Sequence, residues 1–132
     1  MIKQRFNKAI LLSVLLFAFS GFVVAQGTTT RITGVVSDSS GAAVSAATVK
    51  IQREGSEAAL TTQTNNDGVY VFDLIQAGAY TVTVEKAGFK KFVSSKNNVL
   101  INQPATINAA LQVGDVSATV SVEASAAGPV AG

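Results

Sequence analysis

Cysteine, histidine and tryptophan are all absent from this chain of 132 residues. Without cysteine the chain can form no disulfide framework, and it cannot carry the lipid that some exported proteins attach to a cysteine. Without histidine or cysteine it can form neither a zinc site of the usual ligand types nor a Ser-His-Asp or Cys-His catalytic system. The phosphate-binding patterns G-x-x-x-x-G-K-[ST] and G-x-G-x-x-G are also missing. The sequence therefore predicts a protein that is not an enzyme and that uses no metal and no cofactor.

Positive charge becomes scarce once the first 25 residues are set aside. Three basic residues precede an apolar segment, residues 9–24, and Val23-Val24-Ala25 at its end supplies the small residues of a cleavage site. This is the pattern of a secretory signal peptide over residues 1–25, although an uncleaved membrane anchor has a similar pattern. Removing these three from the ten basic residues leaves seven against eight acidic residues, a net charge of −1. The sequence therefore predicts an exported protein and gives no support for nucleic-acid binding.

The remaining chain consists of short alternating segments separated by turn-forming residues. Residues 47–52 and 80–85 alternate apolar and polar side chains, which is typical of half-buried strands, and no helical apolar stripe occurs. We therefore expect an all-β fold in which two antiparallel sheets each bury one face. The residues expected in the core are Val36, Val49, Ile51, Tyr70, Phe72, Leu74, Tyr80, Val82, Val84, Ile107 and Leu111. The residues expected in structural turns are Asp38, Gly41, Asp67, Gly68, Gly78 and Gly88.

The stretch TNNDGVYVFDL, residues 64–74, is compatible with a calcium loop or with a tight turn. Aligned with an EF-hand loop, it places Gln63 at the first position and Leu74 at the twelfth, where acidic ligands are needed. A hairpin requires only the Asn-Asp-Gly turn, because these residues tolerate a positive φ. The sequence therefore favours a hairpin in which Asp67 shapes the turn and Asp73 faces solvent. A weak surface calcium site that uses Asp67 and a neighbouring loop is the alternative.

Five aromatic residues follow the apolar segment, and they bear on sugar binding, which usually relies on exposed aromatic platforms. Tyr70, Phe72 and Tyr80 lie on the apolar face of alternating segments and are expected in the core. Phe89 and Phe92 are therefore the candidate ligand-binding residues. Their alternative role is to cover the edge of a sheet.

Three segments occur in an order that resembles the carboxypeptidase regulatory-like domain family. They are ITGVVSDSSGAAVSAATVKI (32–51), TQTNNDGVYVFDLIQAGAYTVTVEKAGFKKF (62–92) and NAALQVGDVSATVSVEA (108–124). The residues that match the family pattern are Gly34, Val36, Asp38, Gly41, Ala47, Val49, Ile51, Thr64, Asp67, Gly68, Tyr70, Phe72, Gly78, Tyr80, Val82, Gly88 and Phe89. The resemblance covers residues 31–112, and its specificity comes from the sum of the pieces.

This resemblance implies a transthyretin-like, or prealbumin-like, fold across residues 31–112. The family fold is a seven-stranded antiparallel Greek-key β-sandwich, here preceded by the helix of the signal peptide. Residues 26–30 are then a short N-terminal linker, and residues 113–132 are an extended or disordered C-terminal linker rich in Ala, Ser and Gly. The resemblance also implies a noncatalytic module for protein interaction or surface display.

The segment LQVGDVSATVSVEASA, residues 111–126, further resembles the N-terminal extension of Oar-like TonB-dependent outer-membrane receptors of Gram-negative bacteria. This implies a place in the periplasm, at the outer membrane or on the cell surface, with a protein partner there. The chain is then a fragment of a receptor or a short relative of one. It meets the membrane only through the signal segment or through a barrel encoded downstream. The alternative is a carbohydrate-binding-like module that recognises a glycan or another extracellular ligand.

Overall fold

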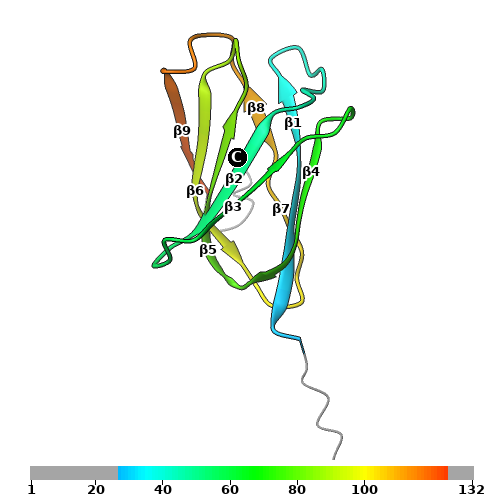
Figure 1. Cartoon of the computed structure of the whole chain (residues 1–132), viewed down its shortest axis with the longest axis vertical. Helices are drawn as coiled ribbons and strands as arrows, with labels where there is room; N and C mark the ends of the chain where they lie inside the picture. Colours follow the sequence, from blue (N-terminus) through cyan, green and yellow to red (C-terminus); the bar gives the residue numbers. More distant parts are fainter. Residues whose placement is uncertain (1–26, 125–132) are drawn as a thin grey trace, which may run out of the picture.

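Two β-sheets packed face to face form the part of the chain that the computed structural model describes, residues 27–124 (Figure 1). The expected signal peptide, with its helix, and residues 125–132 lie outside the described residues. The strands in the described part are β1 (Thr29–Asp38), β2 (Thr48–Arg53), β3 (Ala59–Gln63), β4 (Val69–Gln76), β5 (Gly78–Glu85), β6 (Lys91–Val99), β7 (Ala105–Thr106), β8 (Ala109–Leu111) and β9 (Thr119–Glu123). The prediction of an all-β sandwich is confirmed.

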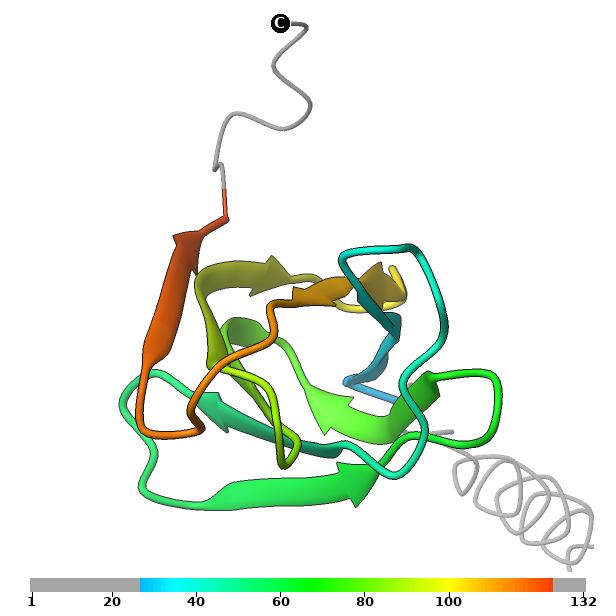
Figure 2. The same ribbon diagram turned by 90° about the horizontal axis from the view of Figure 1, so that it is seen from above.

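The sheets are mixed rather than purely antiparallel, and residues 27–124 contain nine strands rather than seven. One sheet has the order β4-β1-β7, with β8 also paired to β1, and the other has the order β3-β2-β5-β6-β9. Both β7 and β8 run parallel to β1, and β9 runs parallel to β6. Antiparallel neighbours can be joined by tight hairpins, whereas parallel neighbours need a longer crossover. The chain provides these crossovers by running from one sheet to the other and back before it returns to the same sheet (Figure 2).

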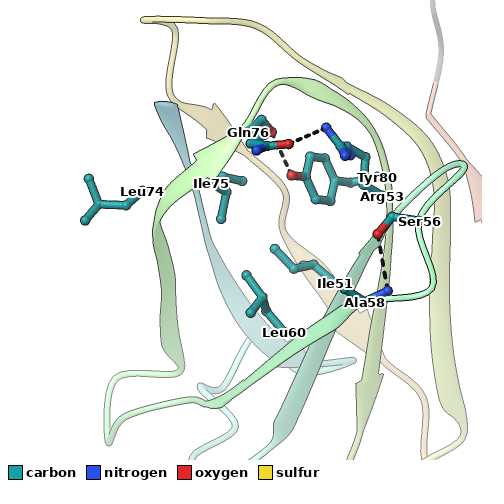
Figure 3. Close-up of a pocket in the computed structure, with 9 residues that line it drawn as sticks. All are labelled: Ile51, Arg53, Ser56, Ala58, Leu60, Leu74, Ile75, Gln76 and Tyr80. Carbon is teal, nitrogen blue, oxygen red and sulfur yellow. Dashed lines mark hydrogen bonds between the residues drawn. The ribbon is translucent and has the colours of Figure 1, made fainter. Parts of the chain in front are cut away.

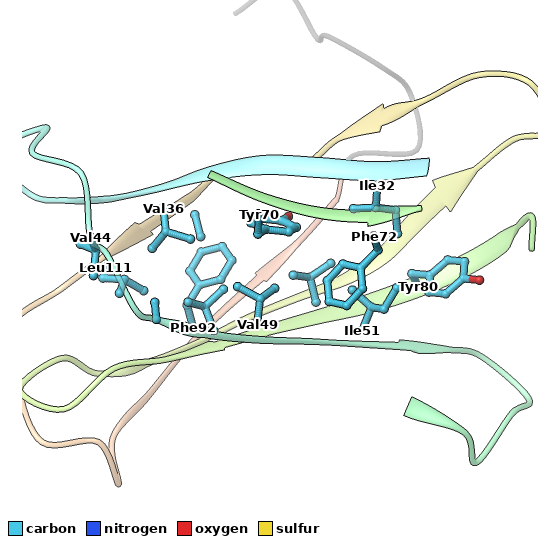
Figure 4. Close-up of a cluster of buried hydrophobic side chains, with 14 of the residues drawn as sticks. Ile32, Val36, Val44, Val49, Ile51, Tyr70, Phe72, Tyr80, Phe92 and Leu111 are labelled. Carbon is cyan, nitrogen blue, oxygen red and sulfur yellow. The ribbon is translucent and has the colours of Figure 1, made fainter. Parts of the chain in front are cut away.

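The core fills the space between the sheets, and alternation along the strands explains most of it (Figure 4). Tyr70 and Phe72 meet edge to face, with ring centroids 5.9 Å apart. Ile107 is half-buried and packs against this cluster. Nine of the expected core residues are buried: Val36, Val49, Ile51, Tyr70, Phe72, Tyr80, Val82, Val84 and Leu111. Buried hydrophobic residues outside the expected set are Ile32, Val44, Ala47, Ile75, Phe92, Val99 and Ala109.

Leu74 was expected in the core, and that expectation is wrong, because its side chain is 78% exposed. The register of β1 against β4 shifts at this point: Thr30 pairs with Ile75, and Ile32 pairs with Phe72. The shift leaves one extra residue on β4, and Leu74 in this bulge has a φ of 54°. The extra residue reverses the alternation, so Ile75 is buried in place of Leu74.

The stretch TNNDG forms a turn between the two sheets, so the prediction of a hairpin is wrong. The preceding strand, β3, pairs with β2, whereas the following strand, β4, pairs with β1. The backbone N–H of Gly68, where φ is 74°, donates to the carbonyl of Asn65 at 2.9 Å. The Oδ1 atom of Asn65 accepts hydrogen bonds from the backbone N–H groups of Asp67 and Val69 at 2.9 and 3.0 Å. Asn65, rather than the expected Asp67, is therefore the side chain that organises this turn.

The remaining expected turn residues lie in turns or at the ends of strands that border them. The Oδ1 atom of Asp38 accepts from the backbone N–H groups of Ser40 and Ala42 at 2.9 and 3.1 Å. Gly41 and Gly88 have φ values of 85° and 88° in the turns that follow β1 and β5. Gly78 opens β5, directly after the bend that ends β4.

The segment that follows residue 112 contributes a strand to the fold. The pairing of β9 with β6 runs from Lys91 opposite Thr119 to Ser95 opposite Glu123. The folded part therefore extends beyond the family-like region and includes the first part of the expected linker, residues 113–132. At the other end, Thr29 and Thr30 of the expected linker 26–30 already belong to β1.

Candidate functional site

A cleft of about 230 Å³ lies where the edge strand β3 of one sheet faces the edge strand β4 of the other (Figure 3). Both strands pair on one side only, and this leaves the sandwich open along this border. The residues that line the cleft are Ile51, Arg53, Ser56, Ala58, Leu60, Leu74, Ile75, Gln76 and Tyr80. They come from four strands and one loop, so only the folded chain brings them together.

The cleft is apolar along most of its length. Ile51, Ile75 and Tyr80 are buried in its floor. Leu60 at the margin is 51% exposed, and Leu74 points outward from β4 at the opposite margin (Figure 3). Apolar side chains gathered at an open cleft are characteristic of binding sites, whereas scattered exposed apolar residues need no explanation. This clustering makes the cleft the best candidate site in the described part of the chain.

One end of the cleft is polar. The guanidinium of Arg53 donates to the side-chain oxygen of Gln76 at 2.7 Å, and the phenol of Tyr80 donates to the backbone carbonyl of Gln76 at 2.6 Å. Burial raises the pKa of Tyr80, and the nearby charge of Arg53 opposes that rise. Within residues 27–124, no carboxylate lies within 4.0 Å of the Arg53 guanidinium. The charge of Arg53 is therefore available to an anionic group of a ligand.

Few groups that could take part in catalysis line the cleft. Its one aliphatic hydroxyl, that of Ser56, accepts a hydrogen bond from the backbone N–H of Ala58 at 3.2 Å. No Asp, Glu or Lys lines the cleft to act as acid or base. Across residues 27–124 there is also no group of three or more acidic residues that could hold a metal ion. The lining of the cleft is therefore mainly apolar, with one guanidinium at its end.

Carboxylates elsewhere stabilise turns and strand pairs. A hydrogen bond from the Ser40 hydroxyl, at 2.6 Å, is the main cause of the lowered pKa of Asp38. The Arg31 guanidinium donates to Asp73 at 2.9 Å, and this hydrogen bond lowers the pKa of the Asp73 carboxyl. Asp73 is exposed, as the sequence predicted. These acids are therefore occupied with structural roles on the surface.

The structure does not bring the two candidate ligand-binding aromatics to the cleft. Phe92 is only 7% exposed, so its expected role in an exposed platform is wrong. It lies opposite Val84 in the sheet, and both side chains point inward. Phe89 lies in the turn before β6, is half-buried and packs against the core. The cleft could not be predicted from the sequence, because the pairing of β3 and β4 with their neighbours decides that Leu60 and Leu74 face outward. The one local signal was Leu60, an apolar residue in an otherwise polar segment.

A second, smaller hollow lies on the outer face of the larger sheet. Its volume is about 120 Å³, and it is lined by Thr48, Lys50, Thr61, Thr83 and Glu85. All of these side chains are polar or charged, so this face has no apolar anchor for a partner.

Within residues 27–124, no helix is long and apolar enough to cross a lipid bilayer.

The fold is similar to several solved structures at low sequence identity. A candidate carbohydrate-binding protein from Bacteroides uniformis ATCC 8492 is 22% identical with a TM-score of 0.52, over 64% of this chain and 42% of the other. Hydroxyquinol 1,2-dioxygenase from Pseudomonas putida DLL-E4 is 9% identical with a TM-score of 0.54, over 69% and 58% of the two chains. The Bacillus anthracis TIE protein is 14% identical with a TM-score of 0.56, over 65% and 17%. This chain thus spans less than two thirds of each of these structures, and the likeness shows a shared fold alone.

The sequence comparisons identify a family but no curated relative. No curated protein matches the chain significantly. Residues 31–112 match the carboxypeptidase regulatory-like domain, and these residues include β1 to β8 except for the first two residues of β1. The match covers more than half of the chain and coincides with the sandwich. The chain therefore belongs to the carboxypeptidase regulatory-like domain family.

Proposed function

We propose that this chain is a noncatalytic, exported β-sandwich module that binds a protein partner at the cleft between β3 and β4. The observation that carries this proposal is the open apolar cleft, with Leu60 and Leu74 exposed at its margins. Arg53 adds a positive charge without an acidic partner among the described residues. An apolar surface with one charged group at its end is typical of a site for a protein segment.

The noncatalytic part of the proposal rests on the residue inventory. The chain has no histidine and no cysteine, and no Asp, Glu or Lys lines the cleft. The dioxygenases among the similar structures are 9–10% identical, so their chemistry is not transferred by the shared fold.

We further propose that the module is the N-terminal extension of a TonB-dependent outer-membrane receptor. Residues 111–126 resemble such extensions, and residues 1–25 have the pattern of an export signal. The test is to read the coding sequence downstream of the codon for Gly132. A continuous frame that encodes a plug and a barrel is expected. A stop codon directly after Gly132 would contradict the receptor proposal and leave the interaction module in place.

The binding site can be tested by placing a photo-cross-linking amino acid at position 60 or 74 of the exported protein. We expect covalent adducts with a partner protein from both positions in the cells that produce it. The matched control is the same amino acid at Lys50, on the polar outer face of β2. Adducts that form equally well from Lys50, or from none of the three positions, would contradict a partner site at the cleft.

A glycan is the other class of ligand to distinguish. Its support from the sequence was Phe89 and Phe92, and of these only the half-buried Phe89 is partly accessible. Binding to a glycan array that is lost in Phe89→Ala and kept in Leu74→Asn would favour the glycan alternative. We expect no such signal.

A further inference from the structure

The edge strand β3 has none of the features that usually prevent an edge from pairing with another chain. Its sequence, ALTTQ, contains no charge and no proline, and its register against β2 is regular from end to end. The other described edges differ: β4 is bulged at Leu74, β7 and β8 have two and three residues, and β9 ends at Glu123. Among these edges, β3 is therefore the one suited to accept a further strand.

The outward side of β3 presents free backbone groups directly beside the cleft. The N–H of Thr64 donates to the carbonyl of Ala47 at 3.0 Å, so the backbone of Thr64 points towards β2. Backbone direction alternates along an antiparallel strand, so the N–H and C=O groups of Thr61 and Gln63 point away from β2. The structure gives β3 no partner on that side. These groups repeat with the spacing that another peptide backbone requires.

We propose that β3 accepts an extended segment of a partner protein as an added antiparallel strand, with an apolar side chain in the cleft and a carboxylate at Arg53. This inference rests on the proposed function of the cleft and names the kind of partner. An antiparallel addition runs in the same direction as β2, from the Gln63 end of β3 towards the Ala59 end. The carboxyl end of the added segment then lies at the end of the cleft where Arg53 is found.

The charge of Arg53 also favours a segment of another protein over a second copy of this chain as the strand added to β3. If two copies paired through β3, each would offer the sequence ALTTQ to the other, and this sequence contains no Asp or Glu. A segment with an acidic residue or a free carboxyl end satisfies both the hydrogen-bonding edge and the guanidinium. Strand addition of this kind derives affinity from the backbone and selectivity from alternate side chains.

The first experiment uses the exported protein and the synthetic peptide Ser-Val-Thr-Val-Ser-Leu-Glu with a free carboxyl end. We expect saturable binding by calorimetry and slowed hydrogen exchange at the amides of Thr61 and Gln63. The control peptide has the same sequence with alternate backbone amides N-methylated. Its binding is expected to be about tenfold weaker or worse, because it cannot form the added ladder. Equal binding of the two peptides would overturn strand addition.

The second experiment changes the protein. Thr61→Pro removes an outward N–H without removing a hydrogen bond to β2, whereas the matched control Thr61→Val keeps that N–H. We expect about tenfold weaker binding in the first variant and unchanged affinity in the second. Arg53→Gln should bind the acidic peptide no better than a peptide that ends in glutamine amide. Retained selectivity for the acidic peptide would overturn the role of Arg53.

The remaining outcomes are also decisive. If Thr61→Pro does not fold, the comparison of methylated and unmethylated peptides decides the question, because it needs no variant. A wild-type dimer that Thr61→Val keeps and Thr61→Pro dissociates would show that a second copy occupies the edge, and this would overturn a foreign segment. If the peptide does not bind while position 60 still cross-links to a partner, strand addition is wrong and the interaction module stands.

Discussion

At the scale of single residues, the turn between the sheets depends on an amide side chain. The Oδ1 atom of Asn65 satisfies two backbone N–H groups of the turn, and the Asn65 backbone makes two further hydrogen bonds, with Gly68 and Val69. Such local side-chain acceptors stabilise turns that have no ladder of their own. Asp67 is exposed, and its carboxylate bonds to no other residue within 27–124. The turn therefore tolerates changes at Asp67 far better than changes at Asn65.

Replacing Asn65 and Asp67 by alanine, one at a time, tests that conclusion. Asn65→Ala should lower the free energy of unfolding by about 1–2 kcal/mol, because two backbone N–H groups lose their acceptor. Asp67→Ala, the matched control, should change it by less than about 0.5 kcal/mol. Urea unfolding monitored by tyrosine fluorescence gives both values. If Asp67→Ala proves the more damaging of the two, the hydrogen bonds of this turn are assigned to the wrong residue.

At the scale of strands, two bulges decide which side chains reach the core. Leu74 on β4 and Lys96 on β6 both have positive φ, at 54° and 58°, and the register shifts beside each of them. After the second bulge Asn97 points inward, where its side-chain amide donates to the carbonyls of Tyr80 and Ser94, both at 3.0 Å. These bonds satisfy an amide that would otherwise be costly to bury.

The bulge in β4 predicts unequal effects of substitutions at two adjacent residues. Leu74→Asn should leave the free energy of unfolding within about 0.5 kcal/mol of the wild type or raise it, because asparagine tolerates a positive φ and the side chain is exposed. Ile75→Ala should lower that free energy by about 2–4 kcal/mol, because it leaves a cavity in the core. Thermal and urea unfolding of the two variants provide the comparison. A large loss in Leu74→Asn would mean that the strand keeps simple alternation.

These bulges also show which buried positions could be predicted from the sequence and which could not. Uninterrupted alternation correctly placed Val82, Val84 and Tyr80 between the sheets. It failed at Leu74, because a bulge depends on the register with a partner strand and has no local signature in a segment of ordinary residues. The candidate cleft could not be predicted from the sequence for the same reason. Its position depends on which two strands lie at the edges of the sheets, and the alternation within one strand gives no information about that.

At the scale of the whole molecule, the chain after the family match completes the larger sheet. The β9 strand covers the edge of β6, and Lys91 donates its backbone N–H to the carbonyl of Ala118 at 2.8 Å. Gly114 bonds to Gly88 at 3.1 Å, which ties the connecting segment to the turn before β6. The strand is mostly exposed, so its contribution is made through backbone pairing and edge protection rather than through the core.

Truncation separates the role of β9 from that of the residues beyond it. Ending the chain after Gln112 should lower the free energy of unfolding by about 1–2 kcal/mol, since the lost hydrogen bonds are partly offset by the entropy of a strand that no longer has to be ordered. The uncovered edge of β6 should also promote self-association at high concentration, visible by light scattering after size exclusion. Ending the chain after Ala124 is the matched control and should preserve both properties, because it keeps the pairing with β6. Equal stability of the two truncated forms would show that the sheet is complete without β9, and the domain would then end where the family match ends.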